Sequence, residues 1–496
     1  MKLTKLSLKN FRCYQAIELE LHPQLTVLVA NNGKGKTALL DAIRIGLWPF
    51  VICFDLARTG ATYPITVDDV FLLKVKEAMA RQLPCEIKIE GDYGAGKTSW
   101  VSSRERESPG AKTLAGFGIK ELKEFASNLQ KTVRNLSDKP IDLPLFGYYG
   151  TGRLWKEKRK KSEKQKKKTE ESTRTFAYCD CLDSASSFKQ FEDWFVHSYK
   201  KVREEQIKQV GEEKLTTFSK QLEEFTSAMS DADPNLSKQL KKLREAVNEV
   251  KLTSAVEDPI KVVQQATNAV LKITHWENLK YSEKSDQSLV MENPEKGILK
   301  VDQLSDGIKN CVAMVADIAY RSYLLNSHLG AKAALKTQGI VMIDEVDMHL
   351  HPKWQQAIVG SLLEAFPNIQ FILTTHSPQV LSTVPYQSIR IIEHSDDPDS
   401  GKISSLARRP DSQSRGLPSP DVMAEIQGVD PVPDIEEARW LSEYKALIEQ
   451  GLHETDSGLQ LRKRLEEHFG ENHQAINECK RLIRLVELKS KFPPKK

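Results

Sequence analysis

The sequence predicts an α/β protein built on a mixed sheet, with a helical insertion and a helical C-terminal tail. Three short apolar runs support the sheet, because each ends abruptly in polar or glycine-rich sequence: 25–29, 340–343 and the first part of 368–378. Such continuous runs are typical of parallel strands buried on both faces. Residues 1–20 alternate between apolar and polar, which predicts half-exposed strands. Charged stretches with apolar residues at helical spacing predict the insertion and the tail.

The bulk composition is typical of an ordinary chain with more than one subdomain. Its 496 residues, 28% charged and 40% hydrophobic, exceed what a single small core requires. A net charge of +4 does not by itself argue for nucleic-acid binding. The lone Cys179 and Cys181 pair indicates ordinary thiols rather than half of a zinc site. Because no stretch approaches the ~18 apolar residues of a membrane helix and no signal-peptide core is evident, we expect a cytoplasmic protein without membrane contact.

A phosphate-binding loop is predicted directly after the first buried strand. The segment Ala30–Thr37, ANNGKGKT, lies between that strand and ALLDAIRIGLW, which is apolar at helical spacing. Strand, glycine-rich loop and helix form the context in which GxxxxGK[ST] binds phosphate through loop N–H groups and the helix N-terminus. Lys36 would neutralise the β- and γ-phosphates, and Thr37 would ligate Mg²⁺. Ala30 replaces the first glycine of the pattern, which is tolerable if it keeps a negative φ.

A second segment, Gly91–Thr98 (GDYGAGKT), matches the same pattern completely but in a different context. It follows the alternating PCEIKIE and precedes SWVSSRERES, which has no apolar helical face. We therefore interpret Gly94, Ala95 and Gly96 as the turn of a β-hairpin and Lys97 as a solvated turn lysine.

The middle of the chain contains a strongly basic run. Residues 143–155 predict a buried strand ending in a glycine turn, and residues 156–168, KEKRKKSEKQKKK, then hold nine basic and two acidic side chains. Such a run cannot bury itself, so it either aids solubility as a solvated loop or contacts a nucleic-acid phosphate backbone. No heptad pattern is sustained through residues 186–272, which excludes long coiled-coil arms.

Two further segments place polar groups at the ends of apolar elements. Residues 303–325 predict a helix capped by Ser305, whose first N–H groups are left for an anion. The apolar run Ile340–Ile343 ends in Asp344 and Glu345. Two acids there would be costly unless a cation or a reacting water needs them, and the alternative is a solvated strand end. The carboxyl ends of strands are where ligands bind in open α/β sheets.

The order of these features resembles the ABC-type P-loop ATPase domain. It comprises a lysine-containing phosphate loop, a helix that opens with LSDG, an apolar strand ending in DE and an apolar strand ending in histidine. The opening KNFRCY is similar to the start of the RecF, Rad50 and SMC branch of that superfamily. The resemblance covers residues 1–60 and 300–380 and implies an ATPase that uses ATP and Mg²⁺.

Carried over residue by residue, the resemblance implies a complete ATPase site. Asp344 would hold Mg²⁺ together with Thr37, Glu345 would polarise the attacking water, and His376 would contact the γ-phosphate. The signature reads LSDG instead of LSGG, and no Q-loop glutamine can be placed near Tyr149–Arg153. Because the signature acts in trans, a dimer or higher homo-oligomer would close over ATP. The residues expected to bind the nucleotide are Asn32, Gly33, Gly35, Lys36, Thr37, Arg12, Ser305 and Gly307.

A closer resemblance is to the Septu anti-phage ATPase family, PtuA, including its retron-associated relatives. It rests on EVDMHLHPKWQ (345–355), TTHSP (374–378), YYGTGR (148–153) and FEDWF (191–195). It implies the ATPase subunit of a defence complex that controls a separately encoded HNH nuclease, PtuB-like. In retron versions a reverse transcriptase and its multicopy single-stranded DNA are further partners. Because Asp396, Asp397 and Asp399 fall in an apparent turn, we expect no nuclease in the same chain.

Two alternatives remain open. A RecF-like DNA repair ATPase would share the same head, and the missing coiled-coil arms count only against a Rad50-like form. A metal-dependent hydrolase would use His349 and His351 as a ligand pair, but the phosphate loop would then be accidental. Nucleic acid is an expected partner under the first alternative and under the defence interpretation.

The expected division of the chain follows these motifs. Residues IRIIEH and GKISSLA flank DDPDS as a predicted hairpin. In the tail, Trp440, Tyr444 and Leu447 lie at helical spacing and either dock a partner or pack back on the protein's own body. The expected domains are an ATPase N-lobe (1–155), a basic loop with helical insertion and hairpin (156–300), an ATPase C-lobe (301–402), a linker rich in Ser and Pro (403–434) and a helical tail (435–496).

Overall fold

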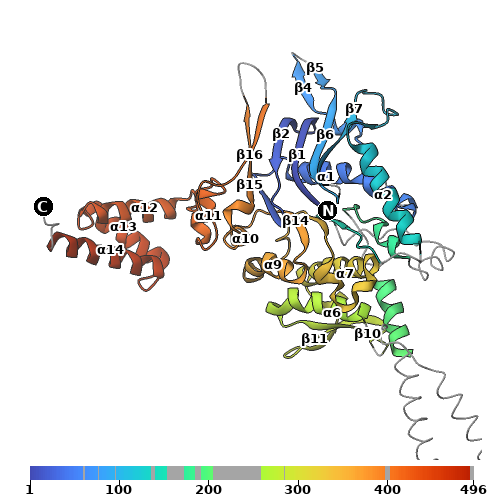
Figure 1. Cartoon of the computed structure of the whole chain (residues 1–496). Helices are drawn as coiled ribbons and strands as arrows, with labels where there is room; N and C mark the ends of the chain where they lie inside the picture. The colour runs from blue at the N-terminus through green and yellow to red at the C-terminus, as the bar shows by residue number, and fades with distance from the viewer. Residues whose placement is uncertain are drawn as a thin grey trace, which may run out of the picture. The chain divides into compact units, whose positions relative to one another are not determined.

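The computed structural model describes most of the chain, which divides into two compact units, Met1–Val422 and Met423–Lys496 (Figure 1). The basic run 156–168 and residues 205–257 of the predicted insertion lie outside the described residues. The parts of the insertion that are described are helical: 191–204 and α6 (Asp258–Leu271). The described residues are 1–59, 62–75, 78–94, 96–135, 140–152, 173–184, 191–204, 258–283, 285–396 and 403–491.

A six-stranded mixed sheet forms the centre of the first unit. Its strand order is β16-β15-β3-β14-β13-β9, in which β16 runs antiparallel to β15 and the other neighbours are parallel. Every residue of β3, β9, β13 and β14 is buried, as the continuous apolar runs predict. The α/β prediction with a mixed sheet is therefore confirmed. The strands are β3 (Leu25–Val29), β9 (Leu145–Tyr149), β13 (Gly339–Ile343), β14 (Ile369–Thr374), β15 (Ile389–Asp396) and β16 (Ile403–Arg408).

The strand register brings the carboxyl ends of the parallel strands to one edge of this sheet. Ile343, the last residue of β13, lies beside Leu373 of β14 and Tyr149 of β9. Thr374, the last residue of β14, lies beside Leu28 of β3. The segments that follow these strands therefore start next to one another, although they are far apart in sequence.

A second, antiparallel sheet has the order β2-β1-β6-β7-β8. β6 and β7 form a hairpin in which Asp92 pairs with Lys97, so the hairpin predicted at the second glycine-rich segment is confirmed. The strands are β1 (Lys2–Phe11), β2 (Tyr14–Glu20), β6 (Cys85–Asp92), β7 (Lys97–Arg104) and β8 (Leu114–Ala115), with a separate pair β4 (Leu72–Val75) and β5 (Ala78–Arg81).

Helix α1 (Lys36–Val51) contacts both sheets, through β14 on one side and β6 and β7 on the other. Its Gly46 fits against β6, since a Cβ there would lie 2.2 Å from the Ile89 Cδ1 atom. The Trp100 indole N–H donates to the Gly46 carbonyl at 2.7 Å. Close packing and this buried hydrogen bond fix the helix that begins at the phosphate loop, and α2 (Ile119–Arg134) packs beside it.

The remaining helices of the first unit include α6, α7 (Asp306–Leu325) and α9 (Pro352–Ala365), which lie together in Figure 1. Next to them β10 (Glu277–Ser282), β11 (Ser288–Asn293) and β12 (Gly297–Lys300) form a three-stranded antiparallel sheet, where the sequence suggested only a hairpin. Shorter helices are α8 (Ala333–Lys336), α10 (Pro378–Leu381) and the 3-10 turns Asp55–Thr59, Val67–Asp69, Arg174–Tyr178, Lys272–Thr274, Val301–Gln303, Ser327–Lys332 and Tyr386–Ser388.

The predicted linker, 403–434, needs correction. Its first residues form β16, which pairs with β15 from Ile403 to Arg408 and confirms the predicted hairpin. Helix α11 (Ser419–Glu425) also falls in this stretch. The reason is that ISSLAR carries its own strand pattern, which the Ser- and Pro-rich composition of the following residues obscured.

The second unit contains three helices, α12 (Glu436–Glu449), α13 (Asp456–Phe469) and α14 (Gln474–Lys491). Tyr444 and Trp440 of α12 pack within this unit, so its apolar face is covered by α13 and α14. The core residues are Tyr444, Ile448, Leu465, Ile476 and Cys479. Among the helices of the described ranges, none has the length and apolar character needed to cross a membrane.

Candidate active site

The predicted phosphate loop connects β3 to α1. Gly33 and Gly35 have φ values of +79° and +85°, which L side chains rarely adopt, and Gly35 caps α1. Ala30, in the place of the first glycine of the pattern, does not have a positive φ, so its methyl group is tolerated. The loop therefore has the backbone that the glycine-rich pattern requires.

Lys36 is the first residue of α1 and is buried behind the loop. Its Nζ donates to the Ala30 carbonyl at 2.8 Å. Burial lowers the pKa of Lys36, while attraction to Asp344, Glu345 and Asp347 acts in the opposite direction. The loop amine and the acids after β13 thus belong to one electrostatic site.

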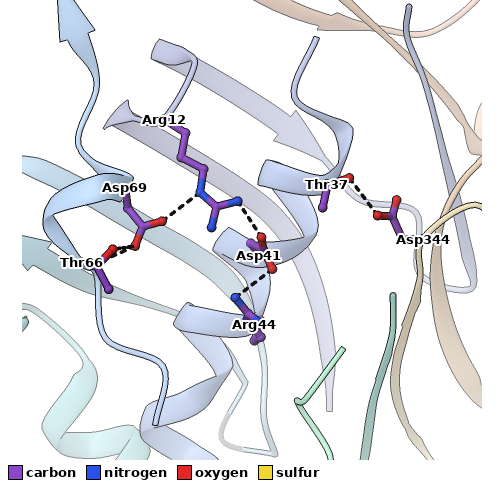
Figure 2. Close-up of polar contacts among 7 residues, drawn as sticks. All are labelled: Arg12, Thr37, Asp41, Arg44, Thr66, Asp69 and Asp344. Atoms are coloured by element: carbon purple, nitrogen blue, oxygen red, sulfur yellow. Dashed lines mark hydrogen bonds and ion pairs between the residues drawn. The ribbon is translucent and has the colours of Figure 1, made fainter. Parts of the chain in front are cut away.

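Asp344 joins the phosphate loop to the end of β13. Its Oδ2 atom accepts a hydrogen bond from the Thr37 hydroxyl at 2.8 Å, across 307 residues of sequence (Figure 2). Its Oδ1 atom accepts one from the Thr374 hydroxyl at 2.6 Å. Mg²⁺ in nucleotide sites is bound by one or two oxygen side chains together with substrate phosphates and water. The carboxylate and hydroxyl predicted as Mg²⁺ ligands lie in direct contact and fit that requirement.

Glu345 follows at the same edge and has an unusual backbone conformation, with φ of +50°. Its N–H donates to the Thr374 hydroxyl oxygen at 2.7 Å. One hydroxyl group therefore positions both acids, by donating to Asp344 and accepting from Glu345. Thr374 was not among the predicted site residues, although the sequence carries a signal for it: a polar residue ends the apolar run of the neighbouring strand.

His376 lies two residues beyond β14. Burial lowers its pKa, and repulsion from Lys36 acts in the same direction against attraction to Asp347, Glu345 and Asp344. These interactions place the imidazole near the same cluster of charges. A lowered pKa favours the neutral ring, which has one N–H donor and one acceptor.

The segments on both sides of His376 are tied to the loop after β13. Thr375 donates through its hydroxyl to the Asp347 carboxylate at 2.5 Å. Ser377 donates to the Gln355 side-chain oxygen at 2.8 Å, and the Gln355 amide in turn donates to the Leu350 carbonyl at 2.9 Å. Hydrogen bonds therefore join the two residues that flank His376 to the loop after β13 and to Gln355.

The signature residues lie at the start of α7. Ser305 is the exposed N-cap of α7, as predicted, and its side chain makes no capping hydrogen bond. Gly307 fits against the loop after β13, because a Cβ at this position would lie 2.3 Å from the His349 carbonyl oxygen. Only glycine allows this approach without a shift of the backbone. Gly307 is thus in contact with the loop that contains His349.

Arg12 lies beside α1 rather than at the loop amine (Figure 2). Its guanidinium donates to Asp69 at 2.8 Å and to Asp41 at 2.6 Å. Asp41 also pairs with Arg44 at 2.9 Å. A direct contact between Arg12 and a nucleotide would require these ion pairs to be exchanged, so the role predicted for Arg12 stays a prediction.

Lys97, the lysine of the second glycine-rich segment, follows a turn whose backbone N–H groups already have a hydrogen-bond partner. The N–H groups of Gly94 and Gly96 donate to the Asp92 carboxylate at 2.7 and 3.2 Å. Lys97 itself is exposed at the start of β7. An anion at this loop would have to replace the Asp92 carboxylate.

The histidine pair considered as metal ligands is arranged differently. His351 caps α9, with its Nδ1 atom accepting from the Lys353 N–H at 3.3 Å. His349 is exposed, with φ of +61°. Within the ranges that the structure describes, no group of three or more His, Cys, Asp or Glu residues could hold a metal ion. The pair therefore has no third ligand there.

Comparison with known proteins agrees with this arrangement. The chain is 27% identical to the Retron Vc95 probable ATPase of Vibrio cholerae serotype O1 biovar El Tor, over 95% of this chain and 88% of that protein. It is 26% identical to the Retron Ec83 probable ATPase of Escherichia coli, over 97% and 86%. A shorter match, 46% identical over 79 residues, covers 16% of this chain and 10% of the Septu protein PtuA of Bacillus mycoides (strain KBAB4). The model of the AAA ATPase domain family matches residues 1–381, so the chain belongs to this family and is an ATPase.

Proposed function

We propose that the phosphate loop, Asp344 and Glu345 form the ATP-hydrolysing site of an anti-phage defence ATPase. Support for the site comes above all from the continuous hydrogen bonds that link Thr37, Asp344 and Thr374. They join the loop to the strand ends at the edge of a parallel sheet where ligands bind.

Phosphoryl transfer requires positioning and neutralisation of charge more than covalent chemistry. In our proposal, Lys36 and the N–H groups of Gly33 and Gly35 bind the phosphates of ATP. Mg²⁺ bound by Thr37 and Asp344 would neutralise charge on the β- and γ-phosphates. Asn32, an exposed residue of the same loop, is a further residue that we propose binds the nucleotide.

Glu345 is the proposed general base for the attacking water. Its backbone is held by Thr374, and it lies in the same electrostatic site as Lys36. A positioned base typically contributes about 10²–10⁴-fold in rate. His376, with its lowered pKa, would contact the γ-phosphate as a neutral donor.

The biological part of the proposal is that this ATPase controls a separately encoded HNH nuclease, PtuB-like, in a retron-associated defence complex. The retron ATPases are similar along nearly the whole chain, and the Septu protein is similar over a short segment. A reverse transcriptase and its multicopy single-stranded DNA are the further partners we propose. The alternative is a RecF-like repair ATPase, in which case the neighbouring genes would encode neither nuclease nor reverse transcriptase.

Alanine substitution of the two candidate lysines tests the site. We expect Lys36→Ala to lower the ATPase rate by about 10²-fold or more, since a buried cation next to the transferring phosphate is lost. Lys97→Ala removes a solvated turn lysine and should change the rate by less than about twofold. Steady-state phosphate release by the purified chain measures both. The reverse order of effects would overturn the assignment of the loop.

The same two variants test the biological role. In cells that carry the chain with its neighbouring genes, Lys36→Ala is expected to abolish protection against phage, and Lys97→Ala to retain it. Plaque counts provide the measurement. Full protection by Lys36→Ala would contradict the defence role and leave the ATPase assignment intact.

A further inference from the structure

The carbonyl of Lys34, in the phosphate loop, is hydrogen-bonded to two side chains. The Tyr14 hydroxyl, at the start of β2, lies 2.9 Å from the carbonyl oxygen. The Nε2 atom of His394, on β15, lies 3.0 Å from the same oxygen. The two rings are stacked, with centroids 5.3 Å apart and planes inclined by 22°. Both lone pairs of this carbonyl therefore have partners.

The direction of each hydrogen bond follows from the chemistry of the groups. A carbonyl oxygen only accepts, so the Nε2 atom of His394 must carry the proton. The Ser405 hydroxyl lies 2.8 Å from the Nδ1 atom on the other side of the ring, and a hydroxyl can act as donor or acceptor there. Ser405 is the direct partner of His394 in the β15–β16 register. Burial raises the pKa of Tyr14, so its hydroxyl also keeps the proton it donates.

The orientation of this carbonyl determines where the next N–H group points. In a trans peptide the C=O and N–H bonds point in opposite directions. A Lys34 carbonyl that faces Tyr14 and His394 therefore directs the Gly35 N–H away from these two side chains. Glycine at position 35 leaves the peptide free to flip, since glycine adopts positive and negative φ about equally. The local sequence alone does not select the orientation.

The turn that carries Tyr14 also restricts the loop by close packing. A Cβ on Gly35 would lie 2.4 Å from the Cys13 Sγ atom and 2.6 Å from the Tyr14 hydroxyl oxygen. The phosphate loop thus packs directly against residues 13 and 14 at Gly35, next to the carbonyl that Tyr14 binds.

We infer that Tyr14 and His394 are positioning residues that orient the Lys34–Gly35 peptide so that its N–H group binds phosphate, with Ser405 fixing the His394 ring. This inference rests on the proposed function of the loop and assigns a role to the β15–β16 hairpin, which the sequence motifs do not include. Neither side chain touches the phosphate. The hairpin acts on ATP binding through one carbonyl group.

Two substitutions of His394 separate hydrogen bonding from packing. His394→Phe keeps a ring against Tyr14 but removes the donor, whereas His394→Gln keeps an N–H donor of similar reach and removes the ring. We expect the Phe variant to weaken MgATP binding about five- to tenfold, the effect of one lost hydrogen bond, and the Gln variant to retain most of the affinity. Titration with MgATP by calorimetry measures this. Tyr14→Phe should weaken binding to a similar degree.

Steady-state kinetics provide a second readout that a general loss of stability would not produce. The Gly35 N–H would contact phosphate both before and during the reaction, so the Phe variant should raise KM with kcat changed less than about twofold. Ser404→Ala, next to Ser405 but exposed on β16, is the matched control for Ser405→Ala. Thermal unfolding of each variant compares their stability.

The outcomes distinguish this inference from the proposed function. If His394→Phe binds MgATP as the unsubstituted chain does, or if His394→Gln is the weakened variant, the positioning role is wrong. If the unsubstituted chain does not bind MgATP, or if Lys36→Ala binds it equally well, the assignment of the loop fails instead. Weak binding by the Phe variant with strong binding by the Gln variant supports the inference.

Discussion

At the scale of single residues, Thr374 joins the two acids of the site, although it lies outside the predicted set. Its hydroxyl donates to Asp344 and accepts from the Glu345 N–H, so it fixes the relative position of the two acids. Glu345 also has a positive φ, which costs roughly 1–3 kcal/mol for a residue other than glycine. The surrounding hydrogen bonds hold this conformation in place, as is common at functional sites.

Replacing Glu345 tests whether it activates the water. Glu345→Gln keeps the size and the backbone hydrogen bond to Thr374 but removes the base. We expect MgATP binding to persist while hydrolysis falls by about 10²–10⁴-fold. Single-turnover assays with labelled ATP measure the rate, and size-exclusion chromatography shows whether a nucleotide-bound oligomer accumulates.

A matched substitution is available on α9. Glu364 is exposed there, and Glu364→Gln should leave the hydrolysis rate within about twofold. Rapid hydrolysis by Glu345→Gln would remove Glu345 from the proposed role.

How much of the site could be predicted depends on whether its residues form a local pattern. Lys36, Thr37, Asp344 and Glu345 belong to short motifs whose chemistry can be inferred from spacing and context. His394 belongs to no such motif. Its contact with Lys34 arises because β15 pairs with β3 in the sheet, and this pairing cannot be deduced from periodicity.

At the scale of elements, a buried ion pair connects α7 with β9. Arg321 and Asp317 of α7 pair at 2.8 Å, with side chains only 3% and 6% exposed. Tyr149, the last residue of β9, donates its hydroxyl to the same carboxylate at 2.8 Å. Burial alone would lower the pKa of Arg321, but attraction to Asp317 raises it above its ordinary value. The pair holds the end of β9 next to Asp344.

Removing one partner of this pair should be strongly destabilising. Asp317→Ala would leave the Arg321 guanidinium buried and uncompensated, and we expect a loss of about 3–5 kcal/mol in the free energy of unfolding. Tyr149→Phe removes only a hydrogen bond and should cost about 1 kcal/mol. Urea unfolding followed by tryptophan fluorescence gives both values.

An exposed pair serves as the comparison. Lys88 and Glu90 pair at 2.8 Å on β6 with side chains 44% and 36% exposed. Lys88→Ala should change the free energy of unfolding by less than about 1 kcal/mol. Equal losses in the free energy of unfolding for Lys88→Ala and Asp317→Ala would contradict the larger contribution expected of the buried pair.

Element types could be predicted where periodicity was strong, and their boundaries could not. The parallel strands and α7 carry clear apolar patterns and were predicted correctly. β16 was partly assigned to a linker because its strand pattern is only six residues long and precedes a Ser- and Pro-rich stretch. The helical tail was predicted, but its packing was left open between a partner and the protein's own body, since an amphipathic helix does not reveal what covers its apolar face.

At the scale of the whole molecule, a signature that acts in trans, as the resemblance implies, predicts that the active form is an oligomer. Gly307 of the signature packs against the His349 carbonyl, in the loop after β13. If the signature completes a site on another chain, ATPase activity per chain should rise with protein concentration. Measuring the rate from nanomolar to micromolar concentrations, with the oligomeric state determined in parallel, checks this.

Mixing two variants that are each expected to be inactive is a stricter test that the ATPase site is shared between two chains. A Lys36→Ala chain keeps its signature, and a Ser305→Arg chain keeps its phosphate loop. Together they should recover part of the activity, since one mixed pair contains one intact site. A constant specific activity from a chain proven to be monomeric would contradict the shared site.

The pairing of β3 also has a consequence for how the protein is made. β3 hydrogen-bonds to β14 and β15, and Thr37 meets Asp344 only 307 residues later in the chain. At about 5–20 residues per second, a ribosome needs roughly 15–60 s to bridge that interval. During this time a nascent chain exposes an apolar strand with unpaired edges, which is a target for chaperones. An interrupted translation product that ends before β13 therefore cannot assemble the ATPase site, because the Thr37–Asp344 contact cannot form.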